Sequence, residues 1–476
     1  MDPKPLVLDR PAMLSVADLE RIEDAAGRIL REVGMEVRGR DVADRLAARG
    51  FRATDGRVRI EPAVFRAFLR EERERHGHAF STRAEPPRPE TSAITVGISN
   101  YALHVHDLAT DRIVPFSTER LVEATKLADV LSERGVRATA PGTPTDVPGP
   151  LQPVVQLWVS ATHSRHGRHP IDIKSAASLP HVVAMTEVLG QPLEFIAVYV
   201  FTPLALCGES LACALGLGKR LKRVGVAAMP ALGSTASIRA GDAFALAAAE
   251  VVGGAILVRE LLGIRPQWFV GLFPADMRSL MQVFGSPENF LLQLMSGEVN
   301  AFLHGQAWRP GAANVHVMAK MPGPQACAER AALLAAGALL GERYFANVGT
   351  LSLDEVFSAE QLLWDLEIKD GAERLVRGMD GACDAERCLG DLAEALASGS
   401  FAALEATRDA CRQVYWQPRF FERRSLAGWQ AAGEPDVRLA VHDEVRRCVA
   451  RHDYALPPDE QRAIDAILTR ARADLA

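Results

Sequence analysis

The strongest constraint on the fold is a long alternation of short apolar runs with helical stretches, which begins near residue 136. Two of these stretches, 238–262 and 325–341, are rich in alanine and long enough to form helices. Apolar strands that alternate with helices predict a parallel sheet covered on both faces, and the pattern permits a closed barrel. The predicted strands are 138–140, 170–173, 195–201, 224–229, 266–273, 299–304, 314–318 and 343–348.

The chain before and after this alternation has a different pattern. We predict a helical N-terminal region with a linker over 1–92, with Ser15 as the N-cap of its first helix. Residues 93–135 alternate between apolar and polar positions and then become helical, which indicates a β-hairpin or meander followed by a helix. The barrel is expected over 136–431, and a charged helical extension over 432–476.

The composition excludes several classes of protein. The 476 residues are 48% hydrophobic and 24% charged, which is enough for a large core, and the net charge is −6. A nucleic-acid binder would need a basic patch, so none is expected. The sequence has no run of 18 uncharged apolar residues and no signal-peptide pattern at its start. We therefore expect a cytoplasmic protein that does not bind a membrane.

Cysteine and histidine patterns argue against a metal site. The seven cysteines are scattered and contain no C-x-x-C pair, which is typical of reduced thiols. His163, His166 and His169 have a ligand-like spacing, but glycine and proline interrupt the segment, so the three share no helix face. Nucleotide-binding glycine loops, a Walker lysine and a G-x-S-x-G elbow are also absent from the sequence.

Two charged residues follow the apolar run 268–273 at the predicted end of a strand. Asp276 and Arg278 are two positions apart, where a barrel strand would deliver them to the mouth. Such a pair can bind a small charged ligand, or the two side chains can brace each other. We expect Asp276→Ala or Arg278→Ala to remove activity while leaving the fold intact. A variant that is fully active, or one that unfolds, would indicate a structural role.

Other polar residues extend this candidate site. Gln325 and Glu329 lie one turn apart at a predicted helix start and could face the same cavity, although Glu329 could also pair with Arg330 on a surface. His304 and His316 stand at predicted strand ends. They are candidates for binding a substrate carboxylate, or they are histidines of the core.

A collinear set of landmarks runs over residues 14–470. The set comprises Leu14-Ser15, 28–34, 57–62, Pro203-Leu204, 233–236, 249–251, Gln325-Ala326-x-x-Glu329, Ser358-x-x-Gln361-x-x-x-Asp365-x-Glu367 and Trp416-x-Pro418-x-x-x-x-x-Arg424 with Trp429. In this order they resemble the trimethylamine methyltransferase family. The resemblance implies a (β/α)8 TIM-type barrel that passes a methyl group from an amine to a corrinoid (cobalamin) held by a partner protein.

The resemblance also bears on the substrate. The trimethylamine branch of the family carries pyrrolysine, whereas this sequence has only standard residues. The preferred prediction for the substrate is therefore a betaine-like quaternary amine. A quaternary ammonium is held by cation–π contact and shape, which favours Trp308 as a ligand-binding residue. The predicted substrate-binding set is Asp276, Arg278, His304, Trp308, His316, Gln325 and Glu329, with no metal bound directly.

Three positions depart from the family pattern. Ala406-Thr407 replaces a His-Thr pair, His169-Pro170 replaces Lys-Pro, and 318–324 lacks the usual acidic residues. Altered specificity and loss of methyl transfer both fit these changes. The alternatives are a barrel that binds a small amine without chemistry, and a corrinoid-independent lyase or isomerase with Asp276 as base. Alanine-rich helices such as 243–262 suggest a homo-oligomer.

Overall fold

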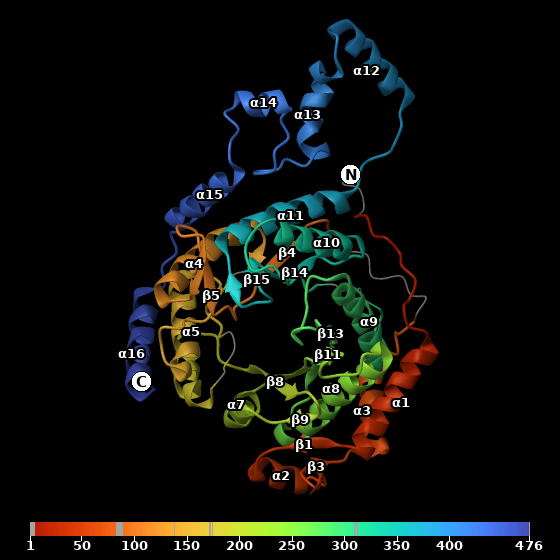
Figure 1. The fold of residues 1–476 in the computed structure, drawn as a ribbon, viewed down its shortest axis with the longest axis vertical. Coiled ribbons are helices and arrows are strands. Elements are labelled where there is room, and N and C mark those ends of the chain that lie inside the picture. Colours follow the sequence, from red (N-terminus) through yellow and green to blue (C-terminus); the bar gives the residue numbers. More distant parts are fainter. Residues whose placement is uncertain are drawn as a thin grey trace.

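The computed structural model describes residues 5–81, 89–137, 139–170, 173, 175–308, 311 and 313–475, and its strands form a ring surrounded by helices (Figure 1). On one side β14 (Tyr344–Val348) pairs with β4 (Thr95–Ile98), and β4 pairs with β7 (Val136–Arg137). On the other side β10 (Arg223–Ala228) lies between β8 (Phe195–Phe201) and β12 (Gln267–Phe269). Every one of these pairings is parallel, so the fold is the predicted α/β barrel of the TIM type.

The barrel helices follow these strands in alternation. They are α4 (Thr118–Leu131), α5 (Gln152–His163), α6 (Leu179–Val188), α7 (Glu209–Leu217), α8 (Ala240–Leu262), α9 (Pro287–His304), α10 (Pro324–Leu339) and α11 (Ala359–Arg377). By length and composition α8 could cross a membrane, but 83% of its apolar window is buried. Such burial is typical of a core helix, since a helix that is apolar all round needs cover on every side.

The N-terminal region packs directly on the barrel. It consists of α1 (Val16–Glu32), β1 (Met35–Val37), α2 (Arg40–Ala47), β2 (Ala53–Thr54), β3 (Arg57–Val58) and α3 (Pro62–Arg75). Ser15 caps α1 in a reciprocal capping box with Asp18, as the sequence predicts. A Cβ on Gly253 of α8 would lie 2.6 Å from Leu30, so this glycine allows α1 to approach α8 closely.

Short strands elaborate the ends of the barrel strands. β5 (His104–Asp107) and β6 (Arg112–Pro115) form the expected antiparallel hairpin. β9 (Ala205–Leu206) folds back on the end of β8 and also pairs with β1. The remaining pairs are β11 (Ala231–Leu232) with β13 (Phe273–Pro274) and β15 (Thr350–Leu351) with β16 (Val356–Phe357).

The C-terminal part consists of an arm that extends from the barrel and two helices that pack back against the barrel. The arm contains α12 (Ala385–Ser398), α13 (Glu405–Val414) and α14 (Leu426–Ala431), and it extends away from the barrel (Figure 1). Then α15 (Val437–Arg451) packs against α4 and α11, and α16 (Pro458–Asp474) against α5 and α6. The domain boundaries at 92, 135 and 431 stay predictions.

Four predicted strands differ from the structure. The strand at 299–304 is wrong, because these residues form the last turns of α9, which Ser286 caps by accepting a hydrogen bond from the backbone of Asn289. At 314–318 only single bridges form, one of them joining Asn314 in parallel to Ala346 of β14. In the predicted strands 138–140 and 170–173, residues 139, 140, 170 and 173 are not in strands, and residues 138, 171 and 172 lie outside the described residues.

Candidate active site in the barrel lumen

The interior of this barrel is open, whereas the interior of most TIM barrels is a packed core. Alternate side chains of a strand face opposite sides, and Ile196, Val198 and Val200 of β8 are buried under the helices. The other set faces the lumen, and it includes Phe195, which is 40% exposed, and Phe201, which is 55% exposed. Aromatic side chains that point into a barrel yet stay accessible mark a cavity rather than a core.

The lumen is layered from the start of the strands to their ends. At the floor Phe195 is in register with Arg223, and two residues farther on Ala197 is in register with Gly225. Above these small residues Tyr199 is in register with Ala227. The absence of a side chain at Gly225 leaves space for the Phe195 ring, since a Cβ on Gly225 would lie 3.2 Å from this ring.

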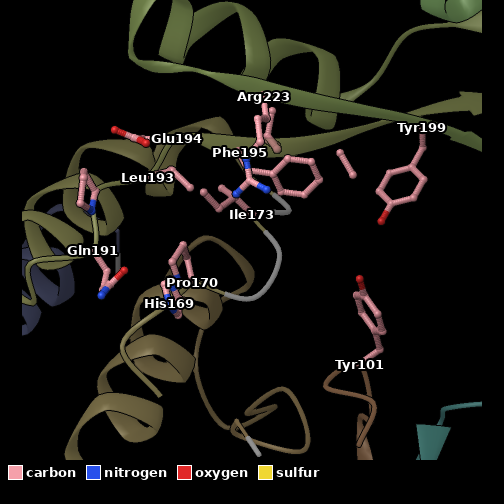
Figure 2. A pocket seen from close by; sticks show the side chains of 13 residues that line it. Tyr101, His169, Pro170, Ile173, Gln191, Leu193, Glu194, Phe195, Tyr199 and Arg223 are labelled. Carbon is pink, nitrogen blue, oxygen red and sulfur yellow. The ribbon is translucent and has the colours of Figure 1, made fainter. Parts of the chain in front are cut away.

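A cavity of about 420 Å³ occupies this lumen (Figure 2). Its lining includes Tyr101 after β4, Tyr199 and Phe195 of β8, Ile173, and Arg223 of β10. Figure 2 shows the Tyr101 and Tyr199 rings on two sides of the space, with their hydroxyl groups directed toward each other. Tyr199 thus stands above the floor, and the Arg223 guanidinium stands at the floor beside Phe195.

Two arginines of the barrel strands lie over aromatic rings. The Arg223 guanidinium lies 5.5 Å from the centroid of Phe195, and that of Arg137 lies 4.7 Å from the centroid of Tyr344. Among the described residues, neither arginine has a carboxylate within 4.0 Å. Glu194 also lines the cavity, but it is bound to Lys222 at 2.5 Å.

The mouth of the barrel is bordered by apolar side chains. Pairing of β11 with β13 holds the loop after β10 beside the loop after β12. Large exposed apolar residues on these loops and at the strand ends are Phe201, Met229, Ile238, Met277, Leu280 and Met281. An exposed apolar rim of this kind is typical of a surface that meets another molecule.

Asp276 and Arg278 brace each other in the loop after β13. The Asp276 carboxylate accepts a hydrogen bond from the backbone N–H of Arg278 at 3.0 Å and from its Nε at 3.3 Å. These hydrogen bonds lower the pKa of Asp276. The Arg278 side chain is 93% exposed. Of the two interpretations open from the sequence, this geometry shows the mutual brace, and their role in binding stays a prediction.

His316, Gln325 and Glu329 lie together behind the mouth. Gln325 donates to the Glu329 carboxylate at 2.7 Å, and the same carboxylate accepts from the backbone N–H of Met318 at 2.7 Å. His316 is 2.6 Å from the Asn314 side-chain oxygen, and burial lowers its pKa to about 3. A histidine that stays neutral carries no charge for a substrate carboxylate.

His304 and Trp308 lie elsewhere. His304 ends a helix rather than a strand, and its ring stacks on Trp268 at 3.6 Å. With Glu72 and His76 it forms a group that could hold a metal ion, but Arg265 donates to Glu72 at 2.7 Å and already neutralises it. Trp308 is buried, and the Arg10 guanidinium covers its ring at 4.3 Å.

Buried charges hold the strand ends in place. Glu250 of α8 accepts from the backbone N–H of Leu204 at 2.9 Å and from the Thr202 hydroxyl at 3.0 Å, and burial raises its pKa to about 7. Arg330 and Asp365 form a fully buried pair at 3.2 Å. Sequence reasoning missed Arg223, Tyr101 and Tyr199, although the alternation in 195–201 and 223–228 marks one inward-facing set on each strand.

Comparisons with known proteins agree with the landmark pattern. The family model of the trimethylamine methyltransferases (MTTB) matches residues 7–476. Trimethylamine methyltransferase MttB1 of Methanosarcina acetivorans is 26% identical over 46% of this chain and 44% of its own length. MttB of Methanosarcina barkeri is 24% identical over 47% of this chain and 44% of its own length. The chain thus spans less than half the length of the curated relatives it matches.

Two solved structures are also similar in outline. The hydroxylamine complex of MtmB gives a TM-score of 0.46 at 10% identity, covering 93% of this chain and 89% of the other. The Methanosarcina barkeri monomethylamine methyltransferase (MtmB) gives 0.44 at 11% identity, covering 91% and 86%. With the family model extending over residues 7–476, this chain belongs to the trimethylamine methyltransferase family.

Proposed function

We propose that this protein transfers a methyl group from a betaine-like quaternary amine to the Co(I) centre of a corrinoid held by a partner protein in the cytoplasm. Family membership supports methyl transfer as the reaction class. The observation that carries the choice of donor is the open, aromatic lumen, in which Tyr101, Tyr199 and Phe195 line one cavity. The curated relatives are named for trimethylamine.

A quaternary ammonium suits this lumen for physical reasons. It has no N–H to donate, so a protein holds it by ring faces and shape, and each desolvated cation–π contact contributes about 2 kcal/mol. The cavity of about 420 Å³ is large enough for a small-molecule ligand. Exclusion of water and fixed orientation are the two contributions that a methyl-transfer step needs from the protein.

The proposed reaction places few chemical demands on the side chains. When the methyl–nitrogen bond of a quaternary amine breaks, both bonding electrons stay on nitrogen and a neutral tertiary amine leaves. No proton has to be supplied, which fits a lumen lined by aromatic rings and the Arg223 guanidinium. The partner's corrinoid would supply the Co(I) nucleophile, and the apolar rim that includes Met229, Ile238 and Met277 offers a surface for its approach.

The test is a donor panel with the purified protein. Trimethylglycine, choline, tetramethylammonium and trimethylamine are each mixed with the protein and either photoreduced cobalamin or the cognate corrinoid protein. Formation of methyl-Co(III) in the visible spectrum with a quaternary amine is the expected result. Binding of an amine without any methyl transfer to the cognate carrier would instead support an amine-binding barrel. Turnover without a corrinoid would support the lyase or isomerase.

A further inference from the structure

We infer that Arg223 binds the carboxylate of the substrate at the floor of the lumen, so that the methyl groups point toward the mouth. This inference rests on the proposed function and assigns specificity within it. A donor with both a quaternary nitrogen and a carboxylate satisfies the two halves of the lumen, whereas a donor that carries only positive charge faces the uncompensated guanidinium of Arg223.

The first argument is the state of the Arg223 side chain. Its guanidinium lines the cavity and has the Phe195 ring on one side at 5.5 Å. Stacking on a ring uses the face of the guanidinium and leaves its N–H groups in the plane free for a bidentate carboxylate. The acidic residue in the described lining of the cavity, Glu194, is bound to Lys222, so the described part of the chain supplies no carboxylate to Arg223.

The layers of the lumen give the bound donor a direction. Tyr199 lies four residues farther along β8 than Phe195, which stands in register with Arg223. At about 3.3 Å per residue the two backbone levels are about 13 Å apart. A carboxylate at the guanidinium therefore directs the quaternary nitrogen toward the tyrosine rings, with its methyl groups on the side of the mouth.

The charge of the cavity lining also favours a carboxylate. The lining holds the Arg223 guanidinium, while the carboxylate among its described residues, that of Glu194, is already paired. An unpaired guanidinium in a cavity repels a monocation, because water screens charges less in a cavity than on a surface. A carboxylate on the ligand removes this repulsion and adds charge-assisted hydrogen bonds. If Arg223 had only a structural role, its contact with the Phe195 ring would suffice, and ligand affinity would not depend on the ligand's charge.

The experiment is calorimetric binding of trimethylglycine and of choline, which share the trimethylammonium group and differ in the carboxylate. The proteins are the wild type, Arg223→Gln, Arg223→Lys and, as a matched loss of charge on the outside, Arg220→Gln, whose side chain pairs with Glu187. Circular dichroism and thermal midpoints establish that each variant is folded.

We expect the wild type to prefer trimethylglycine. Arg223→Gln should weaken trimethylglycine about 30-fold, because the ligand carboxylate loses its charge-assisted hydrogen bonds. It should leave choline unchanged or slightly tighter, with partial rescue in Arg223→Lys and no change in Arg220→Gln. Equal weakening of both ligands, unchanged trimethylglycine binding, or no trimethylglycine binding to the wild type would each overturn the inference.

The outcomes separate this inference from the proposed function. Binding needs no cobalt, so an Arg223-dependent preference without methyl transfer would retain the inference and remove the function. Methyl transfer from trimethylglycine that is as efficient in Arg223→Gln as in the wild type would do the opposite.

Discussion

Two arginines of the barrel, Arg330 and Arg223, differ in what surrounds them. Arg330 is fully buried behind the mouth, where it pairs with Asp365 at 3.2 Å and donates to the carbonyl oxygens of Asn347 and Thr350 at 2.7 and 2.9 Å. Arg223 stands in an open lumen against a ring, with no carboxylate among the described residues. Satisfied charge serves the fold, and unsatisfied charge in a cavity is available to a ligand.

The same contrast separates the mouth from the lumen. Behind the mouth, Glu329, Gln325 and His316 are occupied with neighbouring side chains and backbone groups. In the lumen, the strands instead present rings and small residues to an accessible cavity. We therefore expect substitutions behind the mouth to act mainly on stability, and substitutions in the lumen to act mainly on the substrate.

The largest expected effect is on Arg330. Arg330→Met leaves Asp365 as an unpaired buried charge, which costs about 3–5 kcal/mol of the free energy of unfolding. Arg223→Met, the matched loss of charge in the lumen, should change this free energy by less than about 1 kcal/mol. Urea denaturation of both proteins is the measurement. If Arg330→Met cannot be purified, Arg330→Lys provides the comparison. Equal losses in the free energy of unfolding at Arg330 and Arg223 would contradict the difference between the two arginines.

The next effect depends on pH. Burial raises the pKa of Glu250 from 4.5 to about 7, so between these pH values the carboxyl is protonated in the folded protein and ionised in the unfolded chain. The free energy of unfolding is therefore highest below pH 4.5 and falls by about 3 kcal/mol as the pH rises through 7. We expect Glu250→Gln to flatten this part of the stability profile, measured by urea denaturation at pH 5 and pH 8. An identical profile in the variant would rule out Glu250 as its source.

A smaller effect is expected for the aromatic layer. Tyr199→Leu removes a ring from the lumen and should lower kcat/KM for a quaternary amine about tenfold, which corresponds to one cation–π contact of ~1–2 kcal/mol. Tyr199→Phe retains the ring and is the matched control, expected to stay within a factor of about three of the wild type. If the two variants lose the same activity, the hydroxyl rather than the ring binds the substrate.

The smallest effect on stability is expected at the loop after β13. The Arg278 side chain is exposed and pairs only with its own turn in the described structure, so Arg278→Ala should change the free energy of unfolding by less than about 0.5 kcal/mol. Methyl-transfer assays of the same variant test the role predicted from sequence. Full activity would make the Asp276–Arg278 pair a structural brace, and loss of activity with unchanged stability would place it at the substrate or the partner.

The sequence located four of the barrel strands and two of the barrel helices. Alternating apolar positions located β8, β10, β12 and β14, and alanine-rich stretches located α8 and α10. The segment 299–304 was misassigned, because a short apolar run inside a buried helix has the same composition as a buried strand. Its cap, Ser286-Pro287-Glu288, was the signal that could have corrected this assignment.

The site was harder to predict than the fold. Asp276 and Arg278 stand out in the sequence. However, a turn in which the two side chains bind each other and a site in which they bind a ligand require the same residue types at a strand end. The lumen groups come from β4, β8 and β10, which only barrel closure brings together across more than a hundred residues. Alternation shows that Arg223 and Tyr199 each share a face with other residues, but it does not show that this face is left open.

The most direct test of the account is the position of a bound donor in a crystal structure of the protein with trimethylglycine. The account predicts ligand density inside the lumen, with the trimethylammonium group between Tyr101 and Tyr199 and the carboxylate at Arg223. Density at the Asp276–Arg278 loop, with the lumen filled only by water, would contradict the central claim that the donor binds inside the barrel.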